Sequence, residues 1–289
     1  MQPVTRRGRG TAATSTWLLP CGSRIGTAPL GSRLTREHSA YQDRPLILRR
    51  YIVAETGCAS YLFGCTSKRL LGVVDPHADL VKEYVETADS VGAQITQIFD
   101  THVHADHLSG ALELAKRTGA TVRLPEGAPV QFDFEPLRDN EKVVLGNTRV
   151  MVMSTPGHAW AHACLLVTDA TRGEDPWLVF TGDTLLVGAV GRPDLHGQER
   201  ELAKALRRSI RERLLTLPDW IELCPGHVGG SACATGISSN PSSTIGFERR
   251  HNALLNGDGD DFVERVLAEL TPPPAEFASI YDANRRGSK

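Results

Sequence analysis

The chain has 289 residues, of which 40% are hydrophobic and 23% charged, and its formal net charge at pH 7 is −2. This composition is typical of a globular protein with one large domain or two small ones. A charge near zero excludes strong electrostatic attraction to nucleic acid or to an anionic membrane. The sequence has no run of 18 apolar residues, so it predicts no transmembrane helix. We therefore expect neither a nucleic-acid nor a membrane partner.

The six cysteines contain no CxxC pair, and their irregular spacing does not resemble the disulfide framework of a secreted protein. We expect reduced thiols and a cytoplasmic protein. Residues 1–45 differ from the rest, because they are rich in Arg, Ser and Gly and contain one acid before Asp43. We favour a disordered extension here; the alternative is a targeting segment, which would direct the protein to the mitochondrial matrix. The catalytic domain is expected to occupy residues 46–289.

Short apolar or β-branched runs between Gly and Pro predict strands, and apolar residues at helical spacing predict helices. Expected strands cover residues 46–53, 59–65, 69–75, 95–100, 121–124, 142–145, 148–153, 163–168, 177–180 and 220–223. Expected helices cover residues 79–91, 108–118, 199–215 and 261–270. Strands come in runs and helices follow each half, which favours an α+β sandwich of two sheets over one doubly wound sheet.

Residues 101–107 read THVHADH and follow a predicted strand. His102 and His104 point the same way if the strand continues, and Asp106 and His107 are expected to enter the turn and the first helical residues. A solvated, histidine-rich loop is the alternative interpretation, but three histidines and a carboxylate at this spacing favour one or two metal ions. Nitrogen and oxygen ligands suit zinc, iron or manganese, and the missing cysteine disfavours a structural zinc site.

Three later turns present the same kinds of side chain. Pro-Gly-His158, Gly-Asp183 and Pro-Gly-His227 each follow a predicted strand. His162 lies near the first of these turns but lacks its framing. Each turn alone is weak evidence, but together they repeat one device, a ligand at the end of a strand, which is what a metal cleft needs. Asp75 also ends a strand; it is either a turn residue or an acceptor of hydrogen bonds from the 101–107 segment.

The motifs THxHADH, PGH, TGD and PGH, in this order, resemble the metallo-β-lactamase fold superfamily over roughly residues 46–270. The resemblance implies an αββα sandwich with the metal site at the edge of the two sheets. Residues 180–195 and 243–252 are similar to the persulfide dioxygenase (sulfur dioxygenase) branch, in its bacterial forms that are often fused to rhodanese domains. We expect no rhodanese domain after residue 252, and a separate rhodanese as a pathway partner.

Carried over by position, the resemblance implies that His102, His158 and Asp183 hold one Fe(II) per chain. Such a 2-His-1-carboxylate set leaves open positions on the iron. Four further residues match positions that hold a second metal in the hydrolases of the superfamily and that orient ligands and water in the dioxygenases. These are His104, Asp106, His107 and His227.

The resemblance also implies roles outside the ligand set. Arg249 matches a position that binds a carboxylate of the thiol substrate, and a helix-surface charge is the alternative interpretation. Arg192 and Asp75 are expected to brace the metal loops. The family's GCGR or DVGR stretch appears here as Ala189-Val-Gly-Arg, and Val228-Gly-Gly follows the last histidine. The shape of the thiol pocket is therefore left open.

The resemblance implies a persulfide dioxygenase of sulfide detoxification. It would oxidise a low-molecular-weight thiol persulfide, by default glutathione persulfide, with O2 to sulfite and free thiol. The alternative is a dinuclear zinc thioester hydrolase of the glyoxalase II type (hydroxyacylglutathione hydrolase), in which all seven residues would bind two zinc ions. The C-terminal segment is shorter than the helical domain of that family. A nuclease or a noncatalytic module is disfavoured by the near-neutral charge and the complete ligand set. A homodimer is left open.

Overall fold

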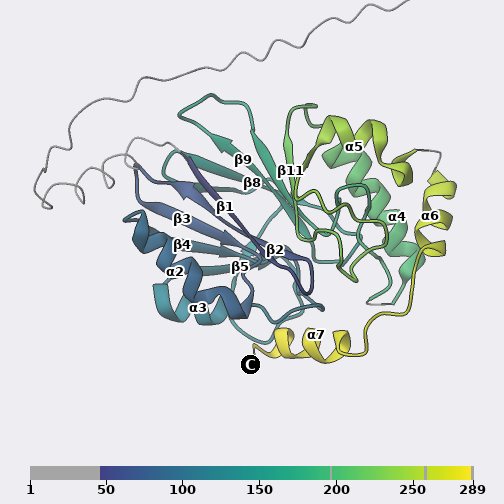
Figure 1. Cartoon of the computed structure of the whole chain (residues 1–289), viewed down its shortest axis with the longest axis horizontal. Helices are drawn as coiled ribbons and strands as arrows, with labels where there is room; N and C mark the ends of the chain where they lie inside the picture. Colours follow the sequence, from purple (N-terminus) through teal and green to yellow (C-terminus); the bar gives the residue numbers. More distant parts are fainter. Residues whose placement is uncertain (1–45, 196, 257–258, 288–289) are drawn as a thin grey trace, which may run out of the picture.

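The computed structural model describes residues 46–195, 197–256 and 259–287. The predicted extension, residues 1–45, lies outside these ranges. Two six-stranded sheets pack face to face, and helices cover both outer faces (Figure 1). This is the αββα sandwich that the sequence predicts. Within the described ranges, no helix is both long and apolar enough to cross a bilayer.

The first sheet has the spatial order β1-β2-β3-β4-β5-β6. Its strands are β1 (Leu46–Val53), β2 (Cys58–Cys65), β3 (Leu70–Val74), β4 (Gln94–Phe99), β5 (Thr121–Pro125) and β6 (Glu135–Leu137). The first two pairings are antiparallel and the others parallel. Because parallel strands point their carboxyl ends the same way, the residues that follow β3 and β4 lie together at one edge.

The second sheet has the order β12-β11-β10-β9-β8-β7. Its strands are β7 (Lys142–Leu145), β8 (Thr148–Ser154), β9 (Ala163–Asp169), β10 (Leu178–Gly182), β11 (Glu222–Pro225) and β12 (Ser243–Thr244). Only β10 and β11 pair in parallel. The chain therefore leaves these two strands at the same edge of the sheet.

Three apolar layers hold the sandwich together. Between the sheets, Phe63 lies 5.0 Å from Phe180 across the interior, measured between ring centroids. The helices α2 (Val81–Ser90) and α3 (Ala111–Thr118) pack on the outer face of the first sheet. On the second sheet, α4 (Glu199–Ser209) and α6 (Gly259–Ala268) take this place. Since both faces of each sheet are covered, β2 is buried at all eight positions.

The predicted strands and long helices are confirmed within a few residues, and the differences have local causes. A π-helical turn, η2 (Ile210–Leu214), continues α4. The helix α3 begins at Ala111 rather than at 108, because Gly110 N donates to Pro76 O at 2.6 Å and so holds the preceding residues as a loop. The expectation that Asp106 and His107 enter the first helical residues was therefore wrong.

The sequence expectation missed several short elements. They are β6, β12, η1 (Ala78–Leu80), α5 (Ile245–His251), η3 (Ala253–Leu255) and α7 (Phe277–Arg286). The helix α7 follows the Pro-rich segment 272–274 and buries only Phe277 fully. It runs along one end of the sandwich, close to α3 (Figure 1).

Candidate metal centre

The predicted ligands come from loops that leave both sheets at one edge. The β4–α3 loop, residues 100–110, joins β4 of the first sheet to α3 and carries the THVHADH segment. His158, Asp183 and His227 follow β8, β10 and β11 of the second sheet. All three residues are buried, with side chains no more than 2% exposed. The structure thus brings the ends of these strands together, and their role as metal ligands stays a prediction.

His102, His158 and Asp183 form the first group. One ligand atom from each lies within 4.8 Å of the others. His158 Nε2 lies 3.6 Å from Asp183 Oδ2. Among the described residues, His102 Nε2 and Asp183 Oδ2 are buried without a hydrogen-bond partner. Buried polar atoms are rarely left unsatisfied, so these converging atoms fit a bound divalent cation.

The hydrogen bonds of these imidazoles leave a lone pair for a metal. His158 Nδ1 donates to Arg192 O at 2.8 Å. The hydroxyl of Thr101 donates to Asp75 Oδ2, so His102 Nδ1, 3.0 Å away, donates to Thr101 Oγ1. In both histidines Nδ1 is protonated and Nε2 is free to bind a cation. In metal sites this tautomer is commonly fixed by a hydrogen bond from the ring nitrogen that does not bind the metal.

A second group adjoins the first. His104, Asp106 and His107 also place their ligand atoms within 4.8 Å of one another. His104 Nε2 donates to Asp75 Oδ1 at 3.2 Å, and His107 Nδ1 donates to Asp106 Oδ2 at 3.1 Å. In the part of the chain that the structure describes, His104 Nδ1 and His107 Nε2 are buried without a hydrogen-bond partner, and His104 Nδ1 lies 3.9 Å from Asp106 Oδ1. The donor set therefore fits a second cation as well.

Electrostatics agree with a cation at this place. Burial lowers the pKa of His102 well below its usual range, and the neighbouring His104 and His158 lower it further. Burial opposes the charge on Asp183, but His227 and His158 outweigh it and hold the pKa of this carboxyl below its ordinary value. Neutral imidazole and ionised carboxylate are the forms that bind metals.

His227 joins the two groups. Its Nδ1 lies 2.7 Å from Asp183 Oδ1, and its Nε2 lies 2.7 Å from Asp106 Oδ2. Burial lowers the pKa of this imidazole, but the neighbouring acidic groups, Asp183 first, raise it well above its usual value. Without a metal, His227 is therefore a cation between two carboxylates.

Asp75 accepts hydrogen bonds from the β4–α3 loop, which is one of the two roles that the sequence left open for it. Its Oδ1 accepts from Thr101 N at 2.7 Å, and its Oδ2 accepts from the hydroxyl of Thr101 at 3.0 Å. The backbone of Asp75 has a φ of 49°, in the left-handed region that non-glycine residues rarely adopt. Such strain persists where surrounding contacts fix it, and here it aims the carboxylate at the loop.

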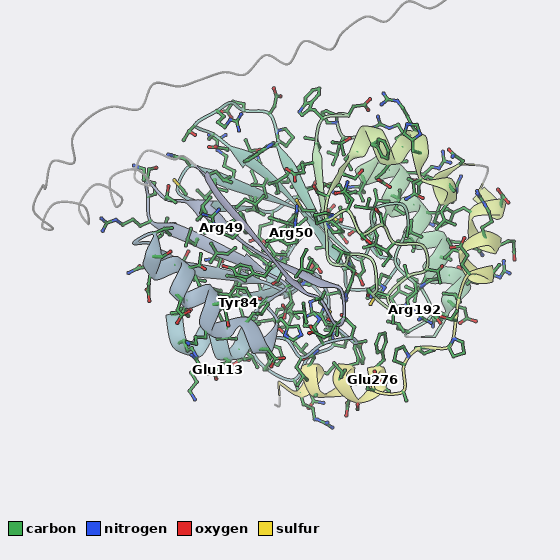
Figure 2. All side chains as sticks on the ribbon, viewed as in Figure 1. Arg49, Arg50, Tyr84, Glu113, Arg192 and Glu276 are labelled. Atoms are coloured by element: carbon green, nitrogen blue, oxygen red, sulfur yellow. The ribbon has the colours of Figure 1, made fainter. Side chains whose placement is uncertain are left out.

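Arg192 braces several loops at once. Its backbone carbonyl accepts from His158 Nδ1, and its guanidinium binds both oxygens of Asp194. The same guanidinium donates to Ala232 O at 3.1 Å and to Thr271 O at 2.5 Å. Figure 2 shows Arg192 at the end of the sandwich near the segment that leads to α7. The predicted supporting role matches these contacts.

Arg249 does not reach the cluster in this structure. It lies on α5, which starts beyond the amino-terminal end of β11, whereas His227 follows the carboxyl end of that strand. Its guanidinium binds Asp219 and donates to Leu215 O at 2.7 Å and to Leu217 O at 2.8 Å. These contacts hold the guanidinium near the turn after η2, away from the end of β11 that leads to His227, so the predicted substrate role has no support in this structure.

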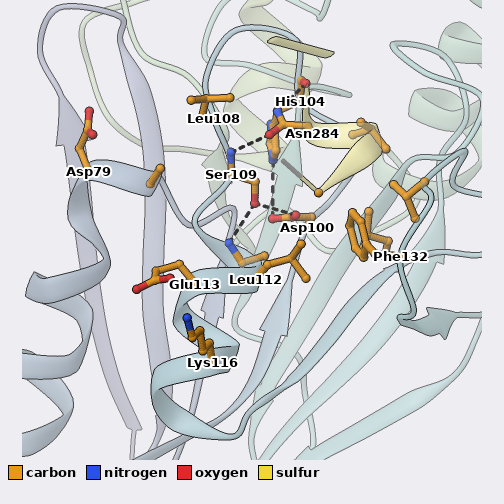
Figure 3. Close-up of a pocket in the computed structure, with 16 residues that line it drawn as sticks. Asp79, Asp100, His104, Leu108, Ser109, Leu112, Glu113, Lys116, Phe132 and Asn284 are labelled. Carbon is orange, nitrogen blue, oxygen red and sulfur yellow. Dashed lines mark hydrogen bonds and ion pairs between the residues drawn. The ribbon is translucent and has the colours of Figure 1, made fainter. Parts of the chain in front are cut away.

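Asn284 of α7 is a residue that the sequence analysis missed. Its Nδ2 donates to the carbonyls of His104 and His107 at 2.9 and 2.8 Å, and its Oδ1 accepts from Ser109 N at 3.0 Å. Figure 3 shows Asn284 beside His104 and Ser109, above a cavity of about 410 Å³. Asp100 lies on the same side of this cavity, and burial raises the pKa of its carboxyl to about 6.

His162 contacts two members of the first group, His102 and Asp183. Its Nε2 accepts from Asp183 N at 3.2 Å, and its ring stacks on that of His102 with centroids 5.1 Å apart. Its Nδ1 lies within hydrogen-bond distance of the hydroxyls of Thr155 and Thr184. Burial lowers the pKa of His162 to about 3. The sequence showed this histidine near the site but gave it no role.

Two glycines let the loops approach one another. Gly182 has a φ of 47°, and a Cβ there would lie 2.6 Å from Thr101 Oγ1 and 2.7 Å from His162 Nε2. A Cβ on Gly226 would lie 2.8 Å from Asp183 Oδ1. The Gly-Asp and Pro-Gly-His turns of the sequence are therefore needed for packing as well as for turning the chain.

Glu248 and Asn252 hold the loop after Asp183. Glu248 Oε2 accepts from Gly188 N at 2.9 Å and from Asn252 Nδ2 at 3.1 Å. Asn252 Nδ2 also donates to Ala189 O at 3.2 Å. Both side chains are buried. They lie in the 243–252 segment that carries the family resemblance, which was the available signal for them.

Comparisons with known proteins agree with this geometry. Residues 92–227 match the family model of the Metallo-beta-lactamase superfamily. The chain is 24% identical over 260 residues to the mitochondrial persulfide dioxygenase ETHE1 of Bos taurus, covering 89% of this chain and 93% of that protein. It is 28% identical over 207 residues to the mitochondrial hydroxyacylglutathione hydrolase of Saccharomyces cerevisiae, covering 68% and 70%.

Solved structures give the same picture. A metallo-beta-lactamase from Staphylococcus aureus subsp. aureus COL superposes with a TM-score of 0.79 and 29% identity, covering 85% of this chain and 74% of that one. ETHE1 from Myxococcus xanthus superposes with a TM-score of 0.73 and 29% identity, covering 84% and 100%. Residues 92–227 thus match a metallo-β-lactamase domain, the described residues have the fold of these solved structures, and proteins named persulfide dioxygenase are among the relatives.

Proposed function

We propose that this protein is a persulfide dioxygenase that works with one Fe(II) held by His102, His158 and Asp183. The observation that carries the proposal is the sulfur-free set of two histidines and one carboxylate, in which His102 Nε2 and Asp183 Oδ2 are buried without a hydrogen-bond partner among the described residues. A 2-His-1-carboxylate set with open positions is typical of non-haem Fe(II) oxygenases. The persulfide dioxygenase relatives, similar over most of the chain, support the same reaction.

The proposed reaction converts RSSH, O2 and H2O to RSH and sulfurous acid, which ionises to sulfite. The terminal sulfur loses four electrons, which O2 accepts, and the S–S bond breaks as the thiol leaves. Bound iron would supply sites for both reactants and a route for electrons from sulfur to oxygen. The chain orients this site through Asp75, Arg192 and Asn284, which fix its loops. No side chain is needed as a nucleophile.

The substrate is expected to enter beside Ala105, between His104 and Asp106 of the loop. A cavity of about 700 Å³ is lined there by Ala105, Leu195 and Tyr281. A second cavity, of about 230 Å³, is lined by Trp160 and by the same Tyr281. The larger cavity is also lined by Asp194 and Asp282, and the apolar side chains of both cavities fit the carbon skeleton of a small thiol, with glutathione persulfide as the default substrate.

The alternative function is a dinuclear zinc thioester hydrolase. The second group, with its unpartnered His104 Nδ1 and His107 Nε2, and the yeast hydroxyacylglutathione hydrolase favour it. In that case His104, Asp106, His107 and His227 would help to hold two zinc ions, which would supply an activated water for hydrolysis of the thioester. The cytoplasmic location, a homodimer and a separate rhodanese partner stay predictions.

Oxygen uptake by the anaerobically purified, iron-loaded protein tests the proposal. We expect uptake on addition of glutathione persulfide, and its loss in His158→Ala. His251→Ala is the matched control, because His251 is exposed and lies on α5. Hydrolysis of S-lactoylglutathione by a two-zinc protein without oxygen uptake would establish the hydrolase instead.

A further inference from the structure

The cavity of about 410 Å³ beneath the β4–α3 loop is not used by the proposed reaction. The helix α3, the loop after β5 and the carboxyl end of α7 supply much of its wall (Figure 3). Of the described residues that line it, none lines the cavity of about 700 Å³ beside Ala105, and only Val103 lines the cavity of about 230 Å³ beside Trp160. It is therefore separate from the expected substrate entrance.

The imidazole of His104 lies between this cavity and the cluster of predicted metal ligands. Its Nδ1 lies 3.9 Å from Asp106 Oδ1, which belongs to the cluster. Its Nε2 lies 4.0 Å from Asp100 Oδ1, and Asp100 lines the cavity. The two nitrogens of one ring thus face two different places, so a molecule in the cavity would lie on the opposite side of the ring from the cluster.

Most of the cavity wall is apolar. The aliphatic and aromatic side chains that line it are those of Val103, Leu108, Leu112, Leu124, Val130 and Phe132. Water finds few hydrogen-bond partners at such a wall, whereas the apolar part of a small molecule is removed from water there. Sites for small molecules typically have volumes of about 300 to 1,000 Å³, mostly apolar walls and a few polar groups. The size and the lining of this cavity therefore fit a small molecule.

One polar atom at this wall lacks a hydrogen-bond partner. Asp100 is 4% exposed, and its Oδ2 accepts from Ser109 Oγ at 2.9 Å. Across the residues that the structure describes, its Oδ1 is buried and has no donor, since His104 Nε2, at 4.0 Å, is too far away for a hydrogen bond. Buried carboxylate oxygens are rarely left unsatisfied. The atom therefore indicates a ligand that brings a hydrogen-bond donor into the cavity.

A metal cation is the rival explanation for this oxygen atom. Asp75, Asp100 and His104 place ligand atoms within 4.8 Å of one another. However, Asp75 Oδ1 accepts from Thr101 N and from His104 Nε2, and Asp75 Oδ2 accepts from the hydroxyl of Thr101. Two of the three side chains therefore already have partners for these atoms, and only Asp100 Oδ1 is left for a ligand.

The charges around the cavity exclude an anionic head group. A carboxylate or a phosphate would face Asp100 and would bring no donor to its Oδ1. Asp79 and Glu113 also line the cavity and outnumber Lys116 (Figure 3). The head group is therefore neutral or cationic.

We propose that this cavity binds a small molecule with an apolar body and one hydrogen-bond donor, a hydroxyl or an amine, that is directed at Asp100 Oδ1. The inference goes beyond the proposed oxidation, because it concerns a separate cavity and holds for any metal in the cluster. Ser109 and Asn284 also line the cavity, and both hold the β4–α3 loop in place. The bound molecule would thus contact residues that fix the predicted metal ligands.

Four probes of similar size test the head group by calorimetric titration of the full-length protein. 2-Phenylethanol and 2-phenylethylamine carry a donor, phenylacetate carries an anion, and ethylbenzene has no polar head. We expect one site per chain for a donor probe, with an affinity at least about tenfold higher than for phenylacetate or ethylbenzene, because only a donor satisfies Asp100 Oδ1. The tighter of the two donor probes tells a hydroxyl ligand from an amine.

A variant that fills the cavity locates the site. Val130→Trp should weaken binding of the donor probe at least about tenfold, because Val130 lines the cavity. Val85→Trp is the matched control, since Val85 is also a half-buried valine on the outer side of the first sheet but is not among the lining residues. Circular dichroism confirms that each variant is folded, and Leu112→Phe is the second filling variant if Val130→Trp is not.

Three results would each overturn the proposal. They are a wild-type protein that binds neither donor probe, equal affinity for a donor probe and for phenylacetate or ethylbenzene, and unchanged binding in a folded filling variant. The outcome is separable from the proposed function, because the probes contain no sulfur and the titration needs no turnover. Oxygen uptake without probe binding refutes only the cavity site, and probe binding without oxygen uptake refutes only the dioxygenase.

Discussion

The side-chain amide of Asn284 donates to the backbone carbonyl of His104 at 2.9 Å, although the two residues are 180 positions apart in the sequence. The same amide reaches His107 O at 2.8 Å and accepts from Ser109 N. One residue of the C-terminal helix thus fixes three backbone groups of the β4–α3 loop. The ligands on this loop depend on α7 for their position.

Replacement of Asn284 tests this dependence. Asn284→Ala removes three hydrogen bonds, each with a net contribution of about 1 kcal/mol, so the free energy of unfolding should fall by about 2 to 3 kcal/mol. Iron affinity should fall as well, because the loop loses its fixed shape. Urea unfolding and iron titration measure the two effects. Ser279→Ala, an exposed change on the same helix that removes one solvent-exposed hydrogen bond to Glu276 O, should lower the unfolding free energy much less and leave iron affinity unchanged.

Metal removal should destabilise the protein. The unpartnered atoms of His102, His104 and His107 are buried, and a bound cation would satisfy them. A cation that binds only the folded state stabilises it by about 2.7 kcal/mol at a hundred times its dissociation constant. We expect chelation to lower the melting temperature and Fe(II) to restore it. A melting temperature that does not respond to the metal would exclude a cation from this cluster.

The free energy of unfolding should depend on pH in a way that shows that His162 is neutral in the folded protein. Burial lowers its pKa in the folded protein to about 3, compared with about 6.5 in the unfolded chain. Below pH 6.5 the unfolded chain therefore binds a proton that the folded chain does not. The stabilisation from neutral His162 is present above pH 6.5 and is lost as the pH falls towards 3.

Urea unfolding of the metal-free protein between pH 7 and pH 4 measures this loss. In this range, the free energy of unfolding should fall less steeply in His162→Asn than in the wild type. The comparison uses the slope, so an overall loss of stability in the variant does not affect it. Equal slopes in the two proteins would contradict a neutral, buried His162.

Arg249→Ala should reduce stability and leave substrate binding unchanged. The guanidinium holds the turn after η2 through Asp219 and two carbonyls, so its loss should cost about 1 to 3 kcal/mol of unfolding free energy. The KM for glutathione persulfide should not change, because this side chain does not reach the cluster. A raised KM with unchanged stability would restore the substrate role that the family resemblance implies.

The sequence predicted the sandwich and the grouping of the ligands because both depend on local patterns. Apolar periodicity marks the strands, and His158, Asp183 and His227 each follow a short turn at a strand end. Strands that run in the same direction in one sheet end at the same edge, so the residues that follow them lie close together. This holds for any connection between the strands.

The sequence could not predict contacts between distant segments that have no shared pattern. Cys58 and Asp106 are 48 positions apart, and Ser109 and Asn284 are 175 apart. For Arg249 the sequence left a substrate role and a helix-surface charge open, because a position in a motif does not fix where a long side chain binds. The nearby acid, Asp219, and the carbonyls at the end of η2 decide its contacts instead.

The stoichiometry of the reaction with glutathione persulfide tests the central claim most directly. The protein is purified anaerobically, its iron and zinc are counted, and O2 consumed, sulfite formed and thiol released are measured together. A dioxygenase predicts about one iron per chain and equal amounts of the three. Two zinc ions per chain with neither oxygen uptake nor sulfite would contradict it.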